Sequence, residues 1–173
     1  QGLGTREQAD QTLREGKDEI LRNCQASLMP PTPHLMELAS THYPTLPKFV
    51  LMNPLDTRHF RHIAQPKYPV PIIAWVGRLD PNKNWELFLK IAAALLRQRP
   101  QMEIWMFLDY QLPSEETKNK FWQYVQRLRL ESNLKLYPNT PNREMPYYLS
   151  RVGDSGGLMI STSTLEGFGY AVA

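Results

Sequence analysis

The stretch IIAWVGRLDPNKN, residues 72–84, decides the fold, because it combines an apolar run, a charged loop and the start of a helix. Ile72–Val76 is a continuous apolar run, which is typical of a strand buried on both faces of a sheet. Asn84 is a residue type that caps helices, and the apolar residues after it share one helix face as far as about Gln98, before Pro100. The stretch therefore predicts one strand–loop–helix unit.

The same alternation continues to the end of the chain. Further strands are expected over residues 102–108, 133–137 and 157–161, and further helices over residues 114–130 and 144–152. Phe121 and Trp122 are both expected to face inward from the first of these helices. Strands that alternate with amphipathic helices form a parallel sheet covered by helices on both faces. The sequence thus predicts an α/β fold, with ligands bound at the carboxyl ends of the strands.

The region before this unit has a different character. Residues 5–22 are predicted to form one helix, which a capping box in Thr5–Gln8 would begin. Nine of the 15 prolines lie within residues 30–71, so we expect only a short helix at residues 34–40 and a short strand at residues 48–53. We interpret this Pro-rich region as a semi-rigid connection between domains.

Composition limits the class of protein. A chain of 173 residues with 42% hydrophobic residues can form one domain, or one domain and part of another. Its net charge of +3 is too small to indicate nucleic-acid binding. The single cysteine, Cys24, excludes an internal disulfide framework and a Cys-rich metal site, and it favours a reducing compartment. No membrane-spanning run or signal peptide is recognisable, and the missing initial Met suggests a piece of a longer protein.

Two segments are candidates for binding an anionic ligand. The loop after the first strand brings the cations Arg78 and Lys83 near Gly77, where a backbone can approach phosphate oxygens. A solvated turn with incidental charges would explain this loop equally well if it stood alone. Residues 161–173, however, read as a strand end, a turn and the first turn of a helix, whose N–H groups suit a phosphate. Glu166 in that turn can accept hydrogen bonds from hydroxyl groups, so the two segments together predict a nucleotide-sugar site.

Other polar features fit structural roles better. His59 and His62 have the spacing of a metal pair, but no nearby carboxylates or cysteines would complete the site, so we expect a surface loop. Asp109 could reach the ligand edge, although loop capping is the simpler explanation. Residues 153–157 are rich in glycine but precede a strand, which indicates a plain turn. Trp75 lies within a buried strand pattern and is expected in the core.

The two anion-binding segments carry a family resemblance. Gly77–Leu79 with Lys83–Asn84, and then Glu166–Gly169, resemble the donor-binding domain of retaining glycosyltransferases of family four, whose members have two Rossmann-like domains. The resemblance covers about residues 25–173. It implies a Rossmann-like parallel sheet with helices on both faces.

The resemblance also implies a domain division. Residues 48–173 would be the donor-binding domain, incomplete at its C-terminus, and residues 1–47 a remnant of the acceptor domain with a Pro-rich linker. Ser27–Thr32 is similar to the last strand of the acceptor domain. Leu51–Phe60 resembles the segment that joins the domains, and Asn53–Leu55 departs from its usual pattern.

Site residues follow from the matched motifs. The implied donor-binding residues are Gly77, Arg78, Lys83, Glu166, Gly167, Phe168, Gly169 and Tyr170. Among them, Arg78 and Lys83 would hold the diphosphate and stabilise the charge of the leaving group, so they would be catalytic. Glu166, the third implied catalytic residue, would bind donor-sugar hydroxyls. The second glutamate of the family's pair would follow directly after Ala173.

The resemblance implies a reaction as well as a site. The absence of an Asp-x-Asp motif leads us to expect metal-independent transfer without a cofactor, and the family retains the anomeric configuration. We expect a uridine diphosphate sugar such as UDP-glucose as donor, and a sugar or lipid-linked acceptor in polysaccharide biosynthesis. The expected location is the cytoplasm, with membrane contact at the inner face through the acceptor domain.

Two alternatives stay open at this point. The chain could be a non-catalytic nucleotide-sugar-binding module, or part of a nucleotide-sugar epimerase or a phosphorylase of similar fold. Because most of the acceptor domain and the second glutamate lie outside the chain, we expect the chain alone to transfer no sugar and to bind donor at most weakly.

Overall fold

The computed structural model describes residues 6–52, 54–166 and 169, which form two compact units. Among the described residues, the first unit comprises those from 6 to 55 together with Leu165, Glu166 and Gly169. The second unit comprises Asp56–Thr164. No helix within the described ranges is both long and apolar enough to cross a membrane.

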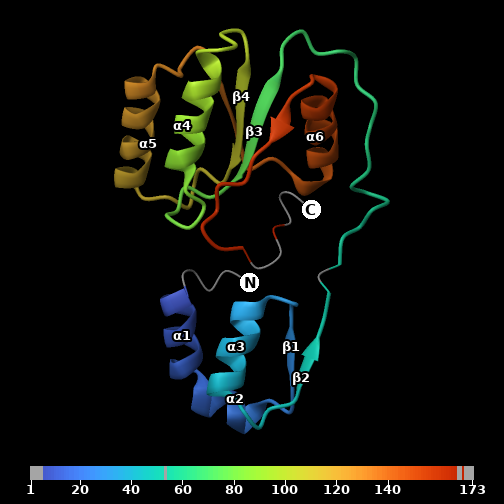
Figure 1. Cartoon of the computed structure of the whole chain (residues 1–173), viewed down its shortest axis with the longest axis vertical. Coiled ribbons are helices and arrows are strands. Elements are labelled where there is room, and N and C mark those ends of the chain that lie inside the picture. The colour runs from blue at the N-terminus through green and yellow to red at the C-terminus, as the bar shows by residue number, and fades with distance from the viewer. Residues whose placement is uncertain (1–5, 53, 167–168, 170–173) are drawn as a thin grey trace. The chain divides into compact units, whose positions relative to one another are not determined.

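A four-stranded parallel sheet with the order β5-β4-β3-β6 forms the centre of the second unit (Figure 1). Its strands are β3 (Ile72–Gly77), β4 (Glu103–Leu108), β5 (Leu134–Pro138) and β6 (Leu158–Met159). Gly77 pairs with Leu108, and Leu108 pairs with Pro138, so these strands end together at the carboxyl edge. The predicted parallel sheet is therefore confirmed.

Helices cover both faces of this sheet. Helices α4 (Trp85–Leu96) and α5 (Glu115–Leu128) lie against one face, and α6 (Met145–Asp154), preceded by the 3-10 turn η1 (Asn142–Glu144), lies against the other (Figure 1). Side chains alternate along β3, so Ile73 and Trp75 pack towards α4 and α5, while Ile72 and Ala74 belong to the core on the α6 side. This arrangement confirms the predicted α/β class.

Two helices of the second unit begin in different ways. Ser114 caps α5 as its sequence position suggests, because its Oγ accepts a hydrogen bond from the N–H of Thr117 at 3.2 Å. Asn84 holds the N-cap position of α4, but its side chain makes no capping bond. Its backbone is left-handed (φ 49°, ψ 47°), a conformation that Asn tolerates better than most residues. Asn84 therefore suits the start of α4 because it tolerates this backbone conformation, and its side chain does not cap the helix as predicted.

The prediction for Trp122 was wrong. Its side chain is 39% exposed, whereas the neighbouring Phe121 is fully buried. Successive residues of a helix differ by about 100° in direction, so both cannot face the same core. The indole N–H of Trp122 donates to the hydroxyl of Tyr110 at 2.9 Å, and the ring lies on the outer side of α5.

A polar network joins β4, β5 and the segment before β3. The carboxylate of Glu103 accepts hydrogen bonds from Lys135 Nζ (2.8 Å), Trp105 Nε1 (2.7 Å) and the Tyr68 hydroxyl (2.9 Å). Burial raises the pKa of Glu103, but these three bonds outweigh burial and hold the pKa below its usual value. The charged carboxylate thus stabilises this edge of the sheet.

Part of the Pro-rich region is anchored to α6. The backbone N–H of Ile63 donates to Ser150 Oγ, and the N–H of Gln65 donates to Asp154 Oδ2, both at 2.9 Å. The bond from Gln65, followed by one from His62, lowers the pKa of Asp154. This half of the Pro-rich region therefore belongs to the second unit and is not a free linker.

The first unit contains three helices and two strands. They are α1 (Arg6–Glu15), α2 (Lys17–Asn23), β1 (Ser27–Met29), α3 (Pro33–His42) and β2 (Lys48–Val50). The predicted single helix at residues 5–22 is two helices that meet at Gly16, whose ψ of −1° departs from the α-helical value. Thr5 of the predicted capping box lies outside the described residues. Strands β1 and β2 pair in parallel.

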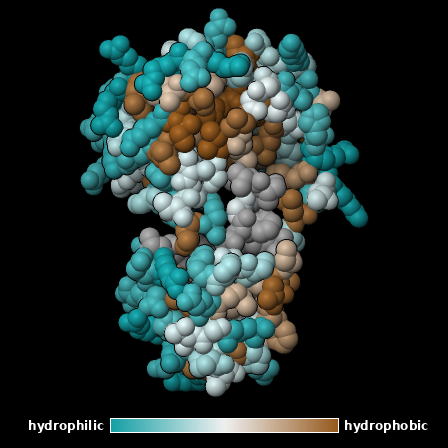
Figure 2. Space-filling view, viewed as in Figure 1, coloured by the Kyte–Doolittle hydropathy of each residue, from teal (hydrophilic) through white to brown (hydrophobic). Residues whose placement is uncertain are grey.

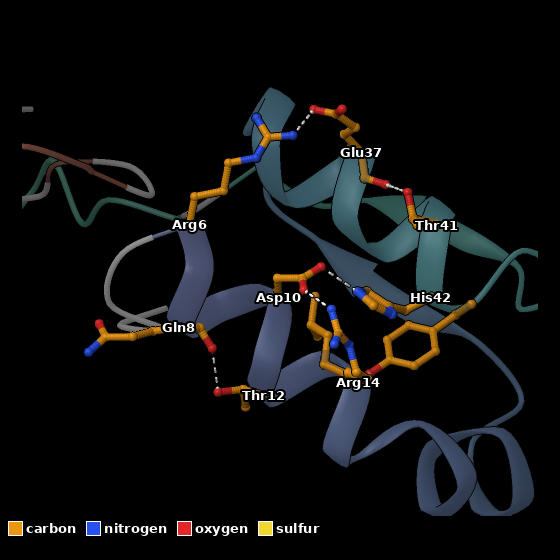
Figure 3. Close-up of polar contacts among 10 residues, drawn as sticks. Arg6, Gln8, Asp10, Thr12, Arg14, Glu37, Thr41 and His42 are labelled. Carbon is orange, nitrogen blue, oxygen red and sulfur yellow. Dashed lines mark hydrogen bonds and ion pairs between the residues drawn. The ribbon is translucent and has the colours of Figure 1, made fainter.

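Charged side chains link α1 to α3 (Figure 3). Arg6 contacts Glu37 at 2.8 Å, and Asp10 contacts both His42 at 2.7 Å and Arg14 at 2.6 Å. The hydrogen bond from His42 is the main reason why the pKa of Asp10 is lowered. The contacts of Arg6 with Glu37 and of Asp10 with His42 join α1 to α3, whereas the pair of Asp10 and Arg14 lies within α1. The buried core of this unit consists of Met29, Ala39, Tyr43 and Leu46.

The strand pair leaves apolar side chains exposed. Figure 2 shows apolar surface beside β2. The exposed residues are Leu28, Phe49, Val50, Leu51 and Met52. Parallel strands are usually covered on both faces, so this two-stranded sheet is less covered than is typical of its type.

Candidate functional site

The loop after β3, residues 77–84, begins at the carboxyl edge of the sheet. Its Leu79 is buried in the core beneath α4, which anchors the loop. A Cβ atom on Gly77 would lie 2.8 Å from Cη2 and Cζ2 of Trp75, and 3.3 Å from Cγ of Lys83. Packing against the Trp75 ring therefore requires glycine here, whether or not a ligand approaches its backbone.

Asp80 organises this loop from within. Its Oδ2 lies 3.0 Å from Nε of Arg78, and its Oδ1 accepts the backbone N–H of Lys83 at 2.9 Å. The Arg78 side chain is 56% exposed. One carboxylate thus fixes both predicted phosphate-binding residues, although sequence reasoning did not select it. The available signal was the turn chemistry of Asp followed by Pro, since Asp bonds the backbone a few residues on.

The exit of β6 meets the same loop. The N–H of Thr164 donates to the carbonyl of Asn82 at 2.8 Å, and its hydroxyl contacts Asn82 Oδ1 at 2.9 Å. The hydroxyl of Thr162 donates to the carbonyl of Lys83 at 2.9 Å. The two predicted segments were expected at one edge of the sheet, and as far as Thr164 the second segment does lie against the first.

The other predicted site residues either group with the first unit or lie outside the described residues. Gly167, Phe168 and Tyr170 are outside the described residues, as is the predicted helix start after them. Glu166 is half-buried and Gly169 is buried with φ 79°, and both group with the first unit. The placement of Glu166 beside Arg78 therefore stays a prediction.

Tyr137 lies in β5, one residue before the carboxyl end of that strand. Its ring stacks on Phe107 with centroids 4.9 Å apart and 19° between the planes, and it also packs against Tyr148. Burial raises the pKa of Tyr137 to about 12, so the phenol stays neutral at ordinary pH. A rigid aromatic cluster therefore supports this strand end.

The alternative polar candidates have structural partners. His59 Nε2 lies 3.4 Å from the carbonyl of Asn142, whereas His62 Nε2 contacts Asp154 at 2.9 Å, so the two rings serve different contacts. Asp109 accepts the N–H of Gln111 at 2.9 Å and caps its loop, as expected. Among the residues with described positions, no three His, Cys, Asp or Glu side chains gather as a metal site.

Helix α6 includes the first two of the Gly-rich residues 153–157, and the other three form the turn that leads to β6. Gly156 has φ 74°, and a Cβ on Gly157 would lie 1.9 Å from the carbonyl oxygen of Ile72. The positive φ favours glycine at position 156 and packing requires glycine at position 157, so the predicted plain turn is present at residues 155–157. The buried position of Trp75 likewise confirms its predicted place in the core.

Solved structures share this fold at low sequence identity. Anabaena HepE in complex with UDP and glucose matches 94% of the chain with a TM-score of 0.73 and 17% identity. Sucrose-phosphate synthase from Thermosynechococcus elongatus matches 94% with a TM-score of 0.72 and 19% identity. A mutant of S. aureus TarM matches 93% with a TM-score of 0.65 and 14% identity. The chain spans 44%, 40% and 29% of these structures, and such identities show the fold alone.

Sequence comparison identifies the family. No curated protein sequence matches the chain. The family model of glycosyl transferases group 1 matches residues 57–173, which is more than half of the chain. The match includes both motifs that suggested a glycosyltransferase. The chain therefore belongs to the group 1 glycosyltransferase family.

Proposed function

We propose that the chain binds the donor of a retaining, family-four glycosyltransferase, with the loop after β3 holding the donor diphosphate. The observation that carries this proposal is the contact between that loop and the exit of β6, where Asn82 and Lys83 are bonded to Thr164 and Thr162. The chain leading to Glu166 thus leaves the sheet next to Lys83. This contact supports a diphosphate site on the loop, and a role for Glu166 in binding the donor sugar is part of the proposal.

A uridine diphosphate sugar is the proposed donor, with UDP-glucose as the first to test. Anabaena HepE has been solved with UDP and glucose, S. aureus TarM with UDP, and pneumococcal GtfA with UDP and GlcNAc. These neighbours share only the fold with this chain, so they support the choice of ligand to test. The proposed acceptor is a sugar or a lipid-linked sugar.

Charge explains how the proposed site would act. When the bond between sugar C1 and the diphosphate oxygen breaks, its electron pair leaves with the diphosphate. The acceptor oxygen bonds to C1 on the same face, and its proton passes to the departing diphosphate. Arg78 and Lys83 would stabilise that charge without a metal ion. Asp80 Oδ2 lies 3.0 Å from Nε of Arg78, and a guanidinium has four N–H donors besides Nε–H.

The binding test uses this chain and NMR titration with UDP. Arg78→Ala and Lys83→Ala should each weaken UDP binding by about tenfold or more, which corresponds to roughly 1.4 kcal/mol. Uridine lacks phosphate and should bind all variants equally. Lys67→Ala is the matched control, because Lys67 is exposed and lies before β3, at the other end of the strand. Equal UDP affinity for all four proteins would overturn the proposed diphosphate site.

Transfer is tested with a protein that contains this chain together with a complete acceptor domain. The anomeric configuration of the product, read by NMR, should match that of the donor, and chelation of divalent metals should leave turnover intact. A strict requirement for Mn²⁺ or Mg²⁺ would contradict the metal-independent part of the proposal. Donor binding without turnover would favour the alternative of a non-catalytic binding module.

A further inference from the structure

The Thr162 hydroxyl joins two segments that are distant in sequence, the exit of β6 and the unit of β3 with its following loop. Its Oγ1 accepts the indole N–H of Trp75 at 3.1 Å and donates to the carbonyl of Lys83 at 2.9 Å. A tryptophan N–H can only donate and a carbonyl can only accept, so the hydroxyl proton has one possible direction. Thr162 and Trp75 are 7% and 1% exposed, so water does not replace either bond easily.

Lys83 is fixed at both ends of its backbone by these contacts. Its N–H is bonded to Asp80 and its C=O to Thr162. The Cγ of Lys83 lies 3.3 Å from the Cβ position of Gly77, so the aliphatic stem of the lysine passes over the glycine. The direction in which the stem leaves the loop is therefore set by the two backbone bonds and by the Trp75 ring beneath Gly77.

Thr162 links the backbone of Lys83 to the segment that follows β6. Two residues separate Thr162 from the end of β6, and the first of them, Ile160, donates its N–H to the carbonyl of Ala74 at 2.9 Å. Removal of the hydroxyl would leave the buried Trp75 N–H and the part-buried Lys83 C=O without this partner, which costs free energy. The loop would then lose one of its two backbone restraints at Lys83.

We propose that Thr162 is a positioning residue for diphosphate binding, acting through the backbone of Lys83. Its hydroxyl holds the loop in the conformation that directs the Lys83 stem across Gly77, so the ammonium group is placed before a ligand arrives. Placement before binding raises affinity because the loop need not be ordered at that step. The inference rests on the diphosphate site proposed above.

The test compares two substitutions of Thr162 in this chain, one without the hydroxyl and one with it. Thr162→Val keeps the shape of the side chain and removes the hydroxyl, whereas Thr162→Ser keeps the hydroxyl. NMR titration with UDP should show about tenfold weaker binding for Thr162→Val, equivalent to roughly 1.4 kcal/mol, and most of the affinity should return in Thr162→Ser. Uridine should bind wild type and both variants alike, since the base and ribose do not need Lys83.

Each outcome has a distinct meaning. If wild type does not bind UDP, the proposed function itself fails. If wild type binds UDP and Thr162→Val binds it equally well, only the positioning role is overturned. Equal loss of UDP and uridine in Thr162→Val, or equal loss of UDP in both variants, indicates a general structural role and also overturns it.

A second measurement covers the case in which Thr162→Val does not fold. In wild type, the indole ¹H–¹⁵N resonance of Trp75 should shift on titration with UDP and stay unchanged with uridine, because the hydroxyl connects that N–H to Lys83. If the chemical shift of the Trp75 indole does not change at saturating UDP, the positioning role is overturned.

Discussion

Substituting Gly77 by Ala tests the packing of the candidate loop most directly. The added Cβ would lie 2.8 Å from two ring atoms of Trp75, where ordinary contacts begin at 3.4 Å. The ring cannot yield cheaply, because it is 1% exposed, stacks on Phe88 with centroids 6.0 Å apart, and is bonded to Thr162. The substitution must therefore displace a buried ring or the start of the loop.

The size of the effect follows from opposing contributions. Overpacking costs about 1–3 kcal/mol, and a weakened bond between Trp75 and Thr162 costs about 1 kcal/mol more. Replacing Gly by Ala restricts the unfolded chain and returns about 0.4–1 kcal/mol. We therefore expect Gly77→Ala to lower the free energy of unfolding by about 1–3.5 kcal/mol.

Gly153→Ala is the matched control with the opposite sign. Gly153 lies in helix α6, and a Cβ there would meet no atom within 4 Å. The same substitution should stabilise the protein by about 0.5–1 kcal/mol, because glycine is a poor helix former.

Urea denaturation followed by tryptophan fluorescence measures both variants in the second unit. All four tryptophans lie in that unit, at positions 75, 85, 105 and 122. If Gly77→Ala proves as stable as wild type while Gly153→Ala is stabilised as expected, the Trp75 ring yields without cost. The packing explanation for Gly77 would then be wrong.

Three further substitutions test the structure at other places. Gly157→Ala should prevent folding of the second unit, seen as loss of amide dispersion in NMR, because its Cβ would lie 1.9 Å from the Ile72 carbonyl oxygen; a folded variant would contradict this. Ser114→Ala should cost about 1 kcal/mol in urea denaturation, since α5 loses its cap, and an unchanged midpoint would show that the cap contributes nothing. Glu103→Gln should cost about 1–3 kcal/mol at pH 7, because a charged acceptor of three hydrogen bonds is lost. The pKa of Glu103 is lowered by folding, so its contribution is complete above the unfolded value of about 4.3 and is lost as pH falls through the folded value. The two proteins should therefore converge in acid, and a constant difference would exclude a role for the charge.

The elements of the second unit could be predicted because their patterns are local. The apolar run at β3 and the one-sided helix after it each lie within a single short stretch, and both were found near their expected bounds. Errors arose where one residue allows two outcomes. Trp122 is apolar enough for a core, but Phe121 already fills the inward position. Gly16 was tolerated within the pattern of one helix, yet its backbone departs far enough to divide that helix.

The candidate site could be predicted only in outline. Arg78 and Lys83 were found from charge and from their place after a strand, which are properties of the sequence itself. Thr162, whose hydroxyl bonds the Lys83 carbonyl, lies 79 residues further along the chain. No local sequence pattern predicts a hydrogen bond from a threonine near a strand end to so distant a carbonyl. The role of Asp80 could have been predicted, because an Asp in a turn commonly bonds a backbone N–H a few residues further along.

The contacts of the loop divide its residues into two groups with different expected behaviour. Gly77, Asp80 and Thr162 hold the loop through packing and backbone bonds that exist without a ligand. Changes to them should therefore alter stability and diphosphate affinity together. Arg78 is largely exposed, and exposed ion pairs contribute little to stability. Its removal should reduce diphosphate affinity while leaving the unfolding midpoint nearly unchanged, so a large stability loss in Arg78→Ala would show that its pairing with Asp80 is structural.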